Sequence, residues 1–203
     1  YDAKNLAFIL PAGKYIGNSR YKDVFAASAM ADLTSFRNHW GAETSLDVEL
    51  YRPVARYELV AKDVATFLNK LSTGGLKGES FTARVKYSDY LPTGYNLWDD
   101  VPKNSLMYME YKVAFERPAD GTKELKLGFD YVLTDAGETV SIPVELEILN
   151  EKNEVLARTA FRIPCERGKN TTVRGNFLTS DANGGIGIDP DYDGDLEVDL
   201  GEL

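Results

Sequence analysis

TVSIPVELEILNEKNEVLARTAFRI, residues 139–163, is the stretch that decides the fold. Its first half has apolar side chains at every second position from Val140 to Ile148, and its second half repeats the alternation from Val155 to Ile163. This period of two is typical of β-strands with one buried face. The polar residues between the halves, 150–153, supply a turn. The stretch therefore predicts an antiparallel β-hairpin.

Alternating segments continue on both sides of this hairpin, separated by turn residues. One short helix interrupts them after Asp63, whose carboxylate can accept amide hydrogens at a helix start, with Phe67 and Leu71 at helical spacing. About seven strands with one helix predict a mostly β protein with a β-sandwich fold, and a β-barrel is the alternative. The further expected strands are residues 46–50, 54–61, 81–87, 106–115, 124–134, 172–179 and 196–200.

Pro53 marks the expected domain boundary, because proline is confined to strand edges, strand starts and bulges. Residues 1–52 are interpreted as a partial N-terminal β domain, either a shortened domain or a remnant of one. Residues 53–203 are interpreted as a C-terminal β-sandwich domain.

The composition of the 203 residues limits the classes of function. With 43% hydrophobic and 11% aromatic residues the chain can build a core, and no apolar stretch approaches the ~20 residues of a membrane-spanning helix. The net charge of -9 and scattered basic residues argue against nucleic acid as a partner. Tyr1 opens the chain without a signal-peptide pattern.

Catalytic signatures are missing from the sequence. His39 is the only histidine and is expected in a polar loop, and the single cysteine, Cys165, is expected as a half-buried thiol without a base to activate it. Glu145 and Glu147 share one face of a strand and are interpreted as a solvated surface rather than a glycosidase pair. We expect a protein that is not an enzyme and has no cofactor.

Two weaker candidate binding sites stand out. Calcium is the only metal that the sequence suggests, at an acidic run whose alternate carboxylates and glycine are similar to the start of a calcium loop, although Leu200 occupies the position of the final glutamate. A long aromatic loop, residues 90–102, offers rings that could stack on sugars, with core packing as the simpler interpretation. The calcium candidates are Asp189, Asp191, Asp193 and Asp195, and the glycan candidates are Tyr90, Tyr95 and Trp98.

Three segments together resemble fimbrillin-like pilin and adhesin-like surface proteins of the Bacteroides group. LYRPVARYEL at 50–59 is similar to their junction between two domains, and YLPTGYN at 90–96 is similar to a loop in the middle of their second domain. IPCERGKNTTVRGNFLTS at 163–180, followed by the acidic loop GGIGIDPDYDG, resembles their C-terminal element. The three segments span about three quarters of the chain.

The resemblance implies transthyretin-like, Greek-key β-sandwich domains in an exported lipoprotein at the outer membrane, exposed on the cell surface. It implies a structural or adhesive role, with other pilus subunits or host and cell-surface ligands as partners. In related pilins a groove left by proteolysis accepts a strand from the next subunit, which is β-strand addition. We expect a pilus subunit or accessory protein in which residues 196–200 and an open N-terminal edge make the contacts. A carbohydrate-binding β-sandwich module is the alternative function.

Overall fold

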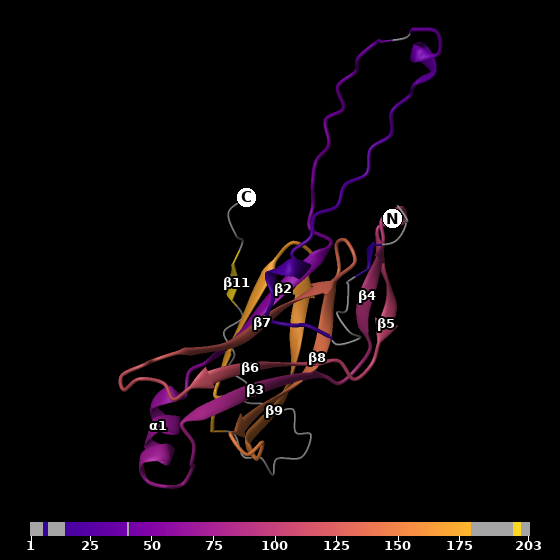
Figure 1. Ribbon diagram of the computed structural model, residues 1–203. Helices are drawn as coiled ribbons and strands as arrows, with labels where there is room; N and C mark the ends of the chain where they lie inside the picture. Colours follow the sequence, from indigo (N-terminus) through magenta and orange to yellow (C-terminus); the bar gives the residue numbers. More distant parts are fainter. Residues whose placement is uncertain (1–5, 8–14, 40, 180–196, 200–203) are drawn as a thin grey trace.

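The computed structural model describes residues 6–7, 15–39, 41–179 and 197–199, and within them the chain forms a β-sandwich with one α-helix (Figure 1). Each of the two main sheets has four strands. The first sheet has the order β11 (Glu197–Asp199), β10 (Asn170–Gly175), β2 (Val54–Ala61) and β7 (Leu125–Leu133). The second has the order β6 (Glu110–Glu116), β3 (Ser80–Tyr87), β8 (Thr139–Asn150) and β9 (Val155–Glu166).

The predicted hairpin is confirmed as β8 and β9, the longest strands of the described chain. Val144 pairs with Phe161, and Ile142 pairs with Ile163. Asn153 closes the turn with a φ of 61°, a left-handed conformation that asparagine tolerates better than most residues. The alternation thus predicted the hairpin and its buried face, but not the register shift between Ile148 and Leu149 that pairs Leu149 with Val155.

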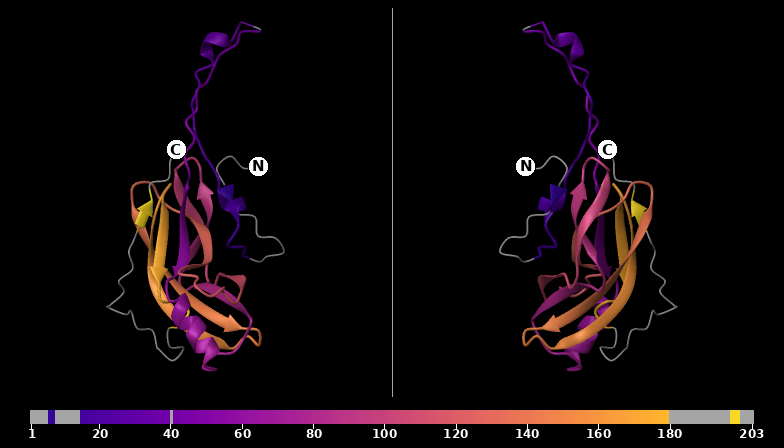
Figure 2. Two further views of the ribbon diagram at one scale, coloured as in Figure 1. Left: turned by 90° about the vertical axis from the view of Figure 1, so that its left-hand side faces the viewer. Right: turned by 90° about the vertical axis from the view of Figure 1, so that its right-hand side faces the viewer.

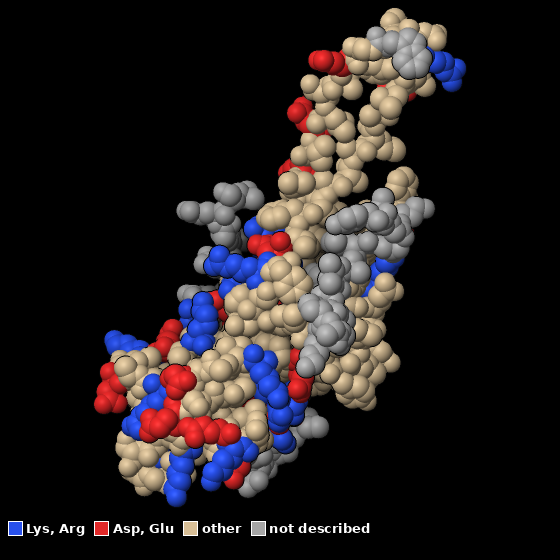
Figure 3. All heavy atoms as spheres, in the orientation of Figure 1, with Lys and Arg blue, Asp and Glu red and all other residues tan. Residues whose placement is uncertain are grey.

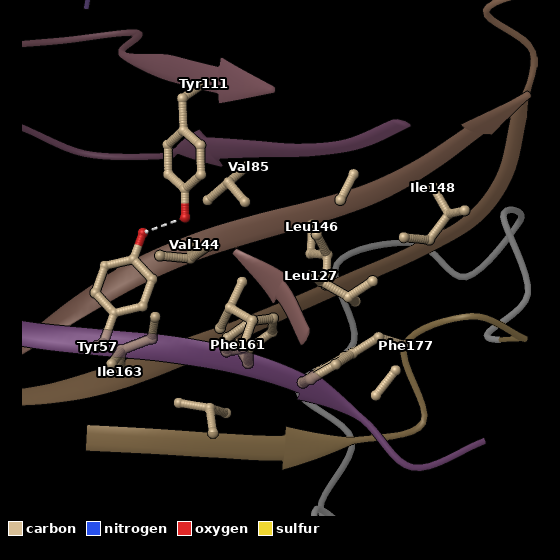
Figure 4. Close-up of a cluster of buried hydrophobic side chains, with 14 of the residues drawn as sticks. Tyr57, Val85, Tyr111, Leu127, Val144, Leu146, Ile148, Phe161, Ile163 and Phe177 are labelled. Atoms are coloured by element: carbon tan, nitrogen blue, oxygen red, sulfur yellow. Dashed lines mark hydrogen bonds between the residues drawn. The ribbon is translucent and has the colours of Figure 1, made fainter. Parts of the chain in front are cut away.

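The core lies between the two sheets and is built from the alternating apolar positions. In β3, Phe81, Ala83, Val85 and Tyr87 are buried while the residues between them are half-buried. Figure 4 shows side chains from both sheets meeting in this layer. Close packing of such side chains supplies most of the stabilisation of a sandwich.

Strand β2 is central to the first sheet. It pairs antiparallel with β7 and parallel with β10, so both of its hydrogen-bonding edges are occupied. Helix α1 (Val64–Ser72) follows β2 and packs Val64, Phe67 and Leu68 into the core. The helix starts where predicted, but Asp63 makes no side-chain bond to it. Its carboxylate instead accepts hydrogen bonds from the Leu178 amide and the Thr179 hydroxyl.

The predicted aromatic loop is largely sheet, which corrects the interpretation of residues 90–102. Strands β4 (Leu91–Asn96) and β5 (Val101–Leu106) form a hairpin, and β1 (Leu6–Ala7) pairs with β4 to complete a small third sheet. The hairpin was not predicted because the segment contains Pro92 and Pro102, which cannot donate hydrogen bonds to a neighbouring strand.

The described residues before Pro53 form two parts. Residues 15–24 lie against the sandwich: Tyr15 packs on the main core, and Val24 packs on a smaller cluster that includes Val54 and Tyr95. Residues 27–50, which we call the arm, leave the sandwich at the end opposite α1 (Figure 1). Two short 3-10 helices, Arg20–Lys22 and Thr34–Phe36, lie before the arm and at its tip.

Candidate interaction surface

The arm stands away from the sandwich in each view of the ribbon (Figures 1 and 2). Its limbs run out and back from a two-residue antiparallel bridge, in which the backbone groups of Ala26 and Tyr51 exchange hydrogen bonds of 2.8 and 2.9 Å. Beyond this bridge, no backbone hydrogen bond joins the limbs among the residues that the structure describes. The arm therefore presents main-chain donors and acceptors to its surroundings.

The returning limb carries the alternating pattern that the sequence assigns to a strand at 46–50. Leu46, Val48 and Leu50 are 53%, 46% and 63% exposed, and Asp47 and Glu49 are exposed between them. The pattern is that of a strand, but in the described part of the chain no neighbouring strand pairs with it. An extended segment with unpaired backbone and alternating apolar side chains has the chemistry of a strand that adds to another sheet.

A hydrogen-bonded cluster anchors the base of the arm. The Asp100 carboxylate accepts hydrogen bonds from the hydroxyls of Tyr51, at 2.7 Å, and Tyr95, at 2.8 Å. Arg167 donates to the same carboxylate at 2.7 Å, and its guanidinium lies 4.1 Å from the centre of the Tyr51 ring. Burial opposes ionisation of Asp100, but the bonds from Arg167, Tyr51 and Tyr95 outweigh it and lower the pKa of Asp100. The end of the arm is thus held to the β4–β5 hairpin.

The other side of the base carries a second set of contacts. Arg52 Nε donates to Asp23 Oδ1 at 2.8 Å, and its guanidinium lies 4.4 Å from the centre of the Phe25 ring. These contacts join the roots of the two limbs. Next to them lies a small polar hollow of about 200 Å³. Its lining residues are Asp23, Arg52, Val54, Arg56, Tyr131, Gly168, Lys169 and Asn170.

The hollow is lined by charged side chains that make ion pairs, one of which joins Arg52 to Asp23. Its cations are paired: Arg56 contacts Glu58 at 3.0 Å, and Lys169 contacts Glu166 at 2.5 Å. Within the described ranges, no group of three or more His, Cys, Asp or Glu residues could hold a metal ion. Figure 3 shows interleaved basic and acidic side chains on the visible face of the sandwich and acidic ones along the arm.

The three aromatic residues predicted to bind sugars do not form one platform. Tyr95 is fully buried, and its hydroxyl is bonded to Asp100. Tyr90 and Trp98 are 63% and 72% exposed, but they flank opposite ends of β4. A strand of this length extends about 20 Å, so these two rings cannot stack on one sugar. The sequence showed the aromatic residues but not which of them face the core.

The other predicted residues have simpler positions. Asp189, Asp191, Asp193 and Asp195 lie outside the described residues. His39 is exposed near the tip of the arm. Cys165 is buried. Its burial, and to a lesser extent the negative charge of Asp130, raise the pKa of its thiol to about 12. A buried thiol with a raised pKa is a poor nucleophile.

The solvated face predicted for Glu145 and Glu147 is wrong for Glu147. That side chain has no exposed surface, because Arg84, Lys86 and Arg158 from the flanking strands cover it. Lys86 Nζ and Arg158 Nη2 lie 2.9 and 2.6 Å from Glu147 Oε1. The alternation correctly placed Glu147 outside the apolar layer, but it contained no information on the cations of neighbouring strands.

Sequence reasoning missed a buried polar cluster that is hydrogen-bonded to core tyrosines. Asp130 and Lys22 are fully buried and contact each other, and the Tyr15 hydroxyl bonds to both. One signal was present: Asp130 interrupts the apolar run of residues 127–133, where an aspartate should either face solvent or be paired. Its partner, more than a hundred residues away, left no local signal.

The described part of the chain contains no helix long and apolar enough to cross a membrane. A solved structure, the "putative cell adhesion protein" from Bacteroides ovatus, is similar at a TM-score of 0.35 and 12% sequence identity. The similarity covers 63% of this chain and 41% of that one. No curated protein matches the sequence. Residues 1–201 match a family of unknown function, DUF6562, and the chain therefore belongs to that family.

Proposed function

We propose that this protein is a structural or adhesive protein of the cell surface, a fimbrillin-like pilus subunit or accessory, which assembles by β-strand addition. The observation that carries the proposal is the arm, whose backbone and alternating apolar side chains have no partner strand in the described chain. Even a fully paired two-stranded hairpin is at best marginally stable in water, and the described limbs of the arm are joined at one bridge, so pairing with a further sheet would stabilise them. In this proposal the partner is a neighbouring subunit.

Sheet edges that could accept such a strand are present. Strand β5 has one neighbour, β4, in the described part of the third sheet, and its residues 104–106 are exposed. Strand β11 has only three residues and occupies the edge of the first sheet by pairing with β10. Main-chain hydrogen bonds along such an edge would supply affinity, and the apolar side chains would supply specificity.

The first test changes one face of the returning limb. Replacing both Leu46 and Val48 with aspartate removes the apolar face of the limb. The matched control, Asp47→Asn combined with Glu49→Gln, changes only the opposite, polar face. Light scattering and electron microscopy of the full chain should show assemblies for the wild type and the control, and monomers for the apolar-face variant. A wild type that stays monomeric, or an aspartate variant that assembles normally, would contradict the proposal.

A second test concerns the C-terminal strand. Deleting residues 190–203 removes β11 and leaves the edge of β10 open. We expect this deletion to alter the assemblies, because a new edge becomes available. Unchanged polymers would rule out a role for this end of the chain.

Carbohydrate binding is the second candidate, favoured by one observation, the exposed ring of Trp98. A single exposed tryptophan can stack on a sugar ring, although the platform of three aromatic residues is not formed. Glycan-array binding that is lost in Trp98→Ala but kept in Tyr108→Ala, where the ring is also exposed, would support this function. An array without any bound glycan would contradict it.

A further inference from the structure

Lys22 is a buried lysine in direct contact with a buried carboxylate. It ends the 3-10 helix Arg20–Lys22, and its side chain and that of Asp130 on β7 have no exposed surface. Lys22 Nζ contacts Asp130 Oδ1, lies 2.6 Å from the Tyr15 hydroxyl and lies 4.1 Å from the centre of the Tyr15 ring. Fully buried lysines are rare, and a buried ion pair costs much of its attraction in lost hydration.

The Asp130 carboxylate is held in a fixed orientation by four donors. Oδ2 accepts the hydroxyls of Tyr15 and Tyr87 at 2.6 and 2.7 Å. Oδ1 accepts the Tyr131 amide at 2.8 Å and contacts Lys22 Nζ. The two oxygens thus differ: Oδ2 accepts hydrogen bonds from two tyrosine hydroxyls, and Oδ1 accepts one from a backbone amide and contacts Lys22 Nζ.

The surrounding side chains continue this polar cluster into the core. Tyr57 bonds to Tyr87 at 2.7 Å and to Tyr111 at 3.2 Å, the bond drawn in Figure 4. Beyond these hydroxyls lie Val85 and Val144 of the apolar layer. Solvent is therefore excluded from the Lys22–Asp130 contact on the core side.

We propose that Lys22 and Asp130 condense to an isopeptide bond. The neutral amine of Lys22 attacks Cγ of the protonated Asp130 carboxyl, so a C–N bond forms. The C–Oδ2 bond then breaks, and Oδ2 leaves with two protons as water. Nothing is oxidised or reduced, and no co-reactant is required. The product is a secondary amide whose carbonyl oxygen is the former Oδ1.

The cluster supplies the groups that this step needs. The Tyr15 hydroxyl lies between Nζ and Oδ2, so it can pass a proton from the attacking amine to the leaving oxygen. The Tyr131 amide points at the oxygen on which negative charge develops. Holding the two reactants in contact removes the entropic cost of bringing them together.

Burial also favours the neutral amine of Lys22 and the protonated phenol of Tyr15. Desolvation lowers the pKa of Lys22 despite the opposing charge of Asp130, which favours the neutral amine. Desolvation and the charge of Asp130 raise the pKa of Tyr15. Its hydroxyl is therefore protonated and has a proton available to pass to the leaving oxygen. Exclusion of water opposes the reverse reaction, hydrolysis, once the released water has left.

Mass spectrometry of the full chain tests the proposal directly. Under denaturing conditions the chain should be lighter than its sequence by one water molecule. Trypsin should not cut after Lys22, and a branched peptide should join residues 21–37 to residues 127–152. A chain with its full sequence mass and a linear peptide of residues 23–37 would overturn the proposal and leave a buried ion pair.

Two variants separate the chemistry from folding. Lys22→Arg keeps a positive charge opposite Asp130 but lacks a nucleophilic amine, so no water should be lost. Tyr15→Phe removes the bridging hydroxyl and should slow cross-linking roughly a hundredfold or more, measured as the linked fraction at fixed times after synthesis. Tyr111→Phe, the control, removes a hydroxyl that bonds only to Tyr57 and should link at the wild-type rate.

Loss of water that persists in Lys22→Arg would also overturn the proposal, because the bond would then involve another residue. If either variant fails to fold, the mass and peptide map of the wild type still decide. Cross-linking does not depend on assembly. A linked chain that remains monomeric would contradict the proposed function and leave this inference standing.

Discussion

Glu147 is a buried carboxylate that forms ion pairs with three cations of the neighbouring strands. Desolvation by itself would raise its pKa, but hydrogen bonds from Lys86, Arg84 and Arg158 lower the pKa of Glu147 to about 2. Three cations from two neighbouring strands thus share one carboxylate. Removing that carboxylate would leave the cations facing one another.

We therefore expect Glu147→Gln to lower the free energy of unfolding by about 3 kcal/mol near neutral pH. Folding lowers this pKa from 4.5 to about 2, so the unfolded chain binds the proton more tightly. The stabilisation is complete above the unfolded pKa and is lost as the pH falls from 4.5 towards 2. Urea unfolding over this range should show the wild type and the variant converging in acid.

Exposed Glu138 provides the control, since Glu138→Gln removes the same charge from a turn. That variant should follow the wild type at every pH. A constant difference between the wild type and Glu147→Gln down to the lowest pH would contradict the role assigned to Glu147.

Asp63 marks what can be predicted for a single residue. Its position just before a helix was correctly read from the apolar spacing that follows it. Its bonds to Leu178 and Thr179 could not be predicted, because these partners are 115 and 116 residues away in the sequence. Tyr95 and Glu147 differ from their predicted surroundings for the same reason: local pattern gives the face of a strand, but not what covers it.

At the scale of elements, residues 15–24 dock on the sandwich through close contacts with aromatic rings. The rings of Tyr15 and Tyr87 meet edge to face with centroids 5.8 Å apart. Gly17 lies on the ring of Tyr111, and a Cβ atom there would overlap that ring. The segment therefore depends on a residue without a side chain at this point.

Gly17→Ala should weaken this docking and cost roughly 1 to 3 kcal/mol, because the ring or the segment must move. Gly75→Ala is the control, since a Cβ atom there meets only the Lys70 carbonyl at an ordinary 3.4 Å. Thermal unfolding measures both. Equal midpoints for the two variants would show that residues 15–24 can shift without cost.

The elements differ in how well the sequence predicts them. Strands β3, β8 and β9 lie close to their expected bounds, because apolar and polar side chains alternate along them. Strand β7 also lies close to its expected bounds, although most of its residues are buried. Strands β4 and β5 were taken for a loop because prolines and polar residues break their alternation. The segment 46–50 has a strand pattern without a sheet, because pairing depends on a neighbour that the pattern cannot specify.

For the whole molecule, the important pairing is the parallel one between β2 and β10. Six residue pairs join them, from Arg56 with Asn170 to Ala61 with Gly175. Local sequence patterns predicted that both segments are strands, but not that they are neighbours. The two-sheet architecture was thus predictable from alternation, whereas the order of strands within each sheet was not.

This pairing makes a sharp prediction about truncated chains. A chain ending at Gly168 lacks β10 together with the buried side chains of Val173, Phe177 and Leu178, and should show no cooperative unfolding transition. A chain ending at Thr179 keeps these residues and should unfold cooperatively. Circular dichroism during heating distinguishes the two, and a cooperative transition in the shorter chain would contradict the central role of β10.

The distance in sequence between β2 and β10 also sets the order of events during folding. Arg56 and Asn170 are 114 positions apart, so β2 cannot gain its parallel neighbour until the residues between them and β10 itself have left the ribosome. Contacts of such long range form slowly. Strand β2 therefore keeps one edge open during synthesis until β10, whose Asn170 comes 114 positions after its partner Arg56, has been made.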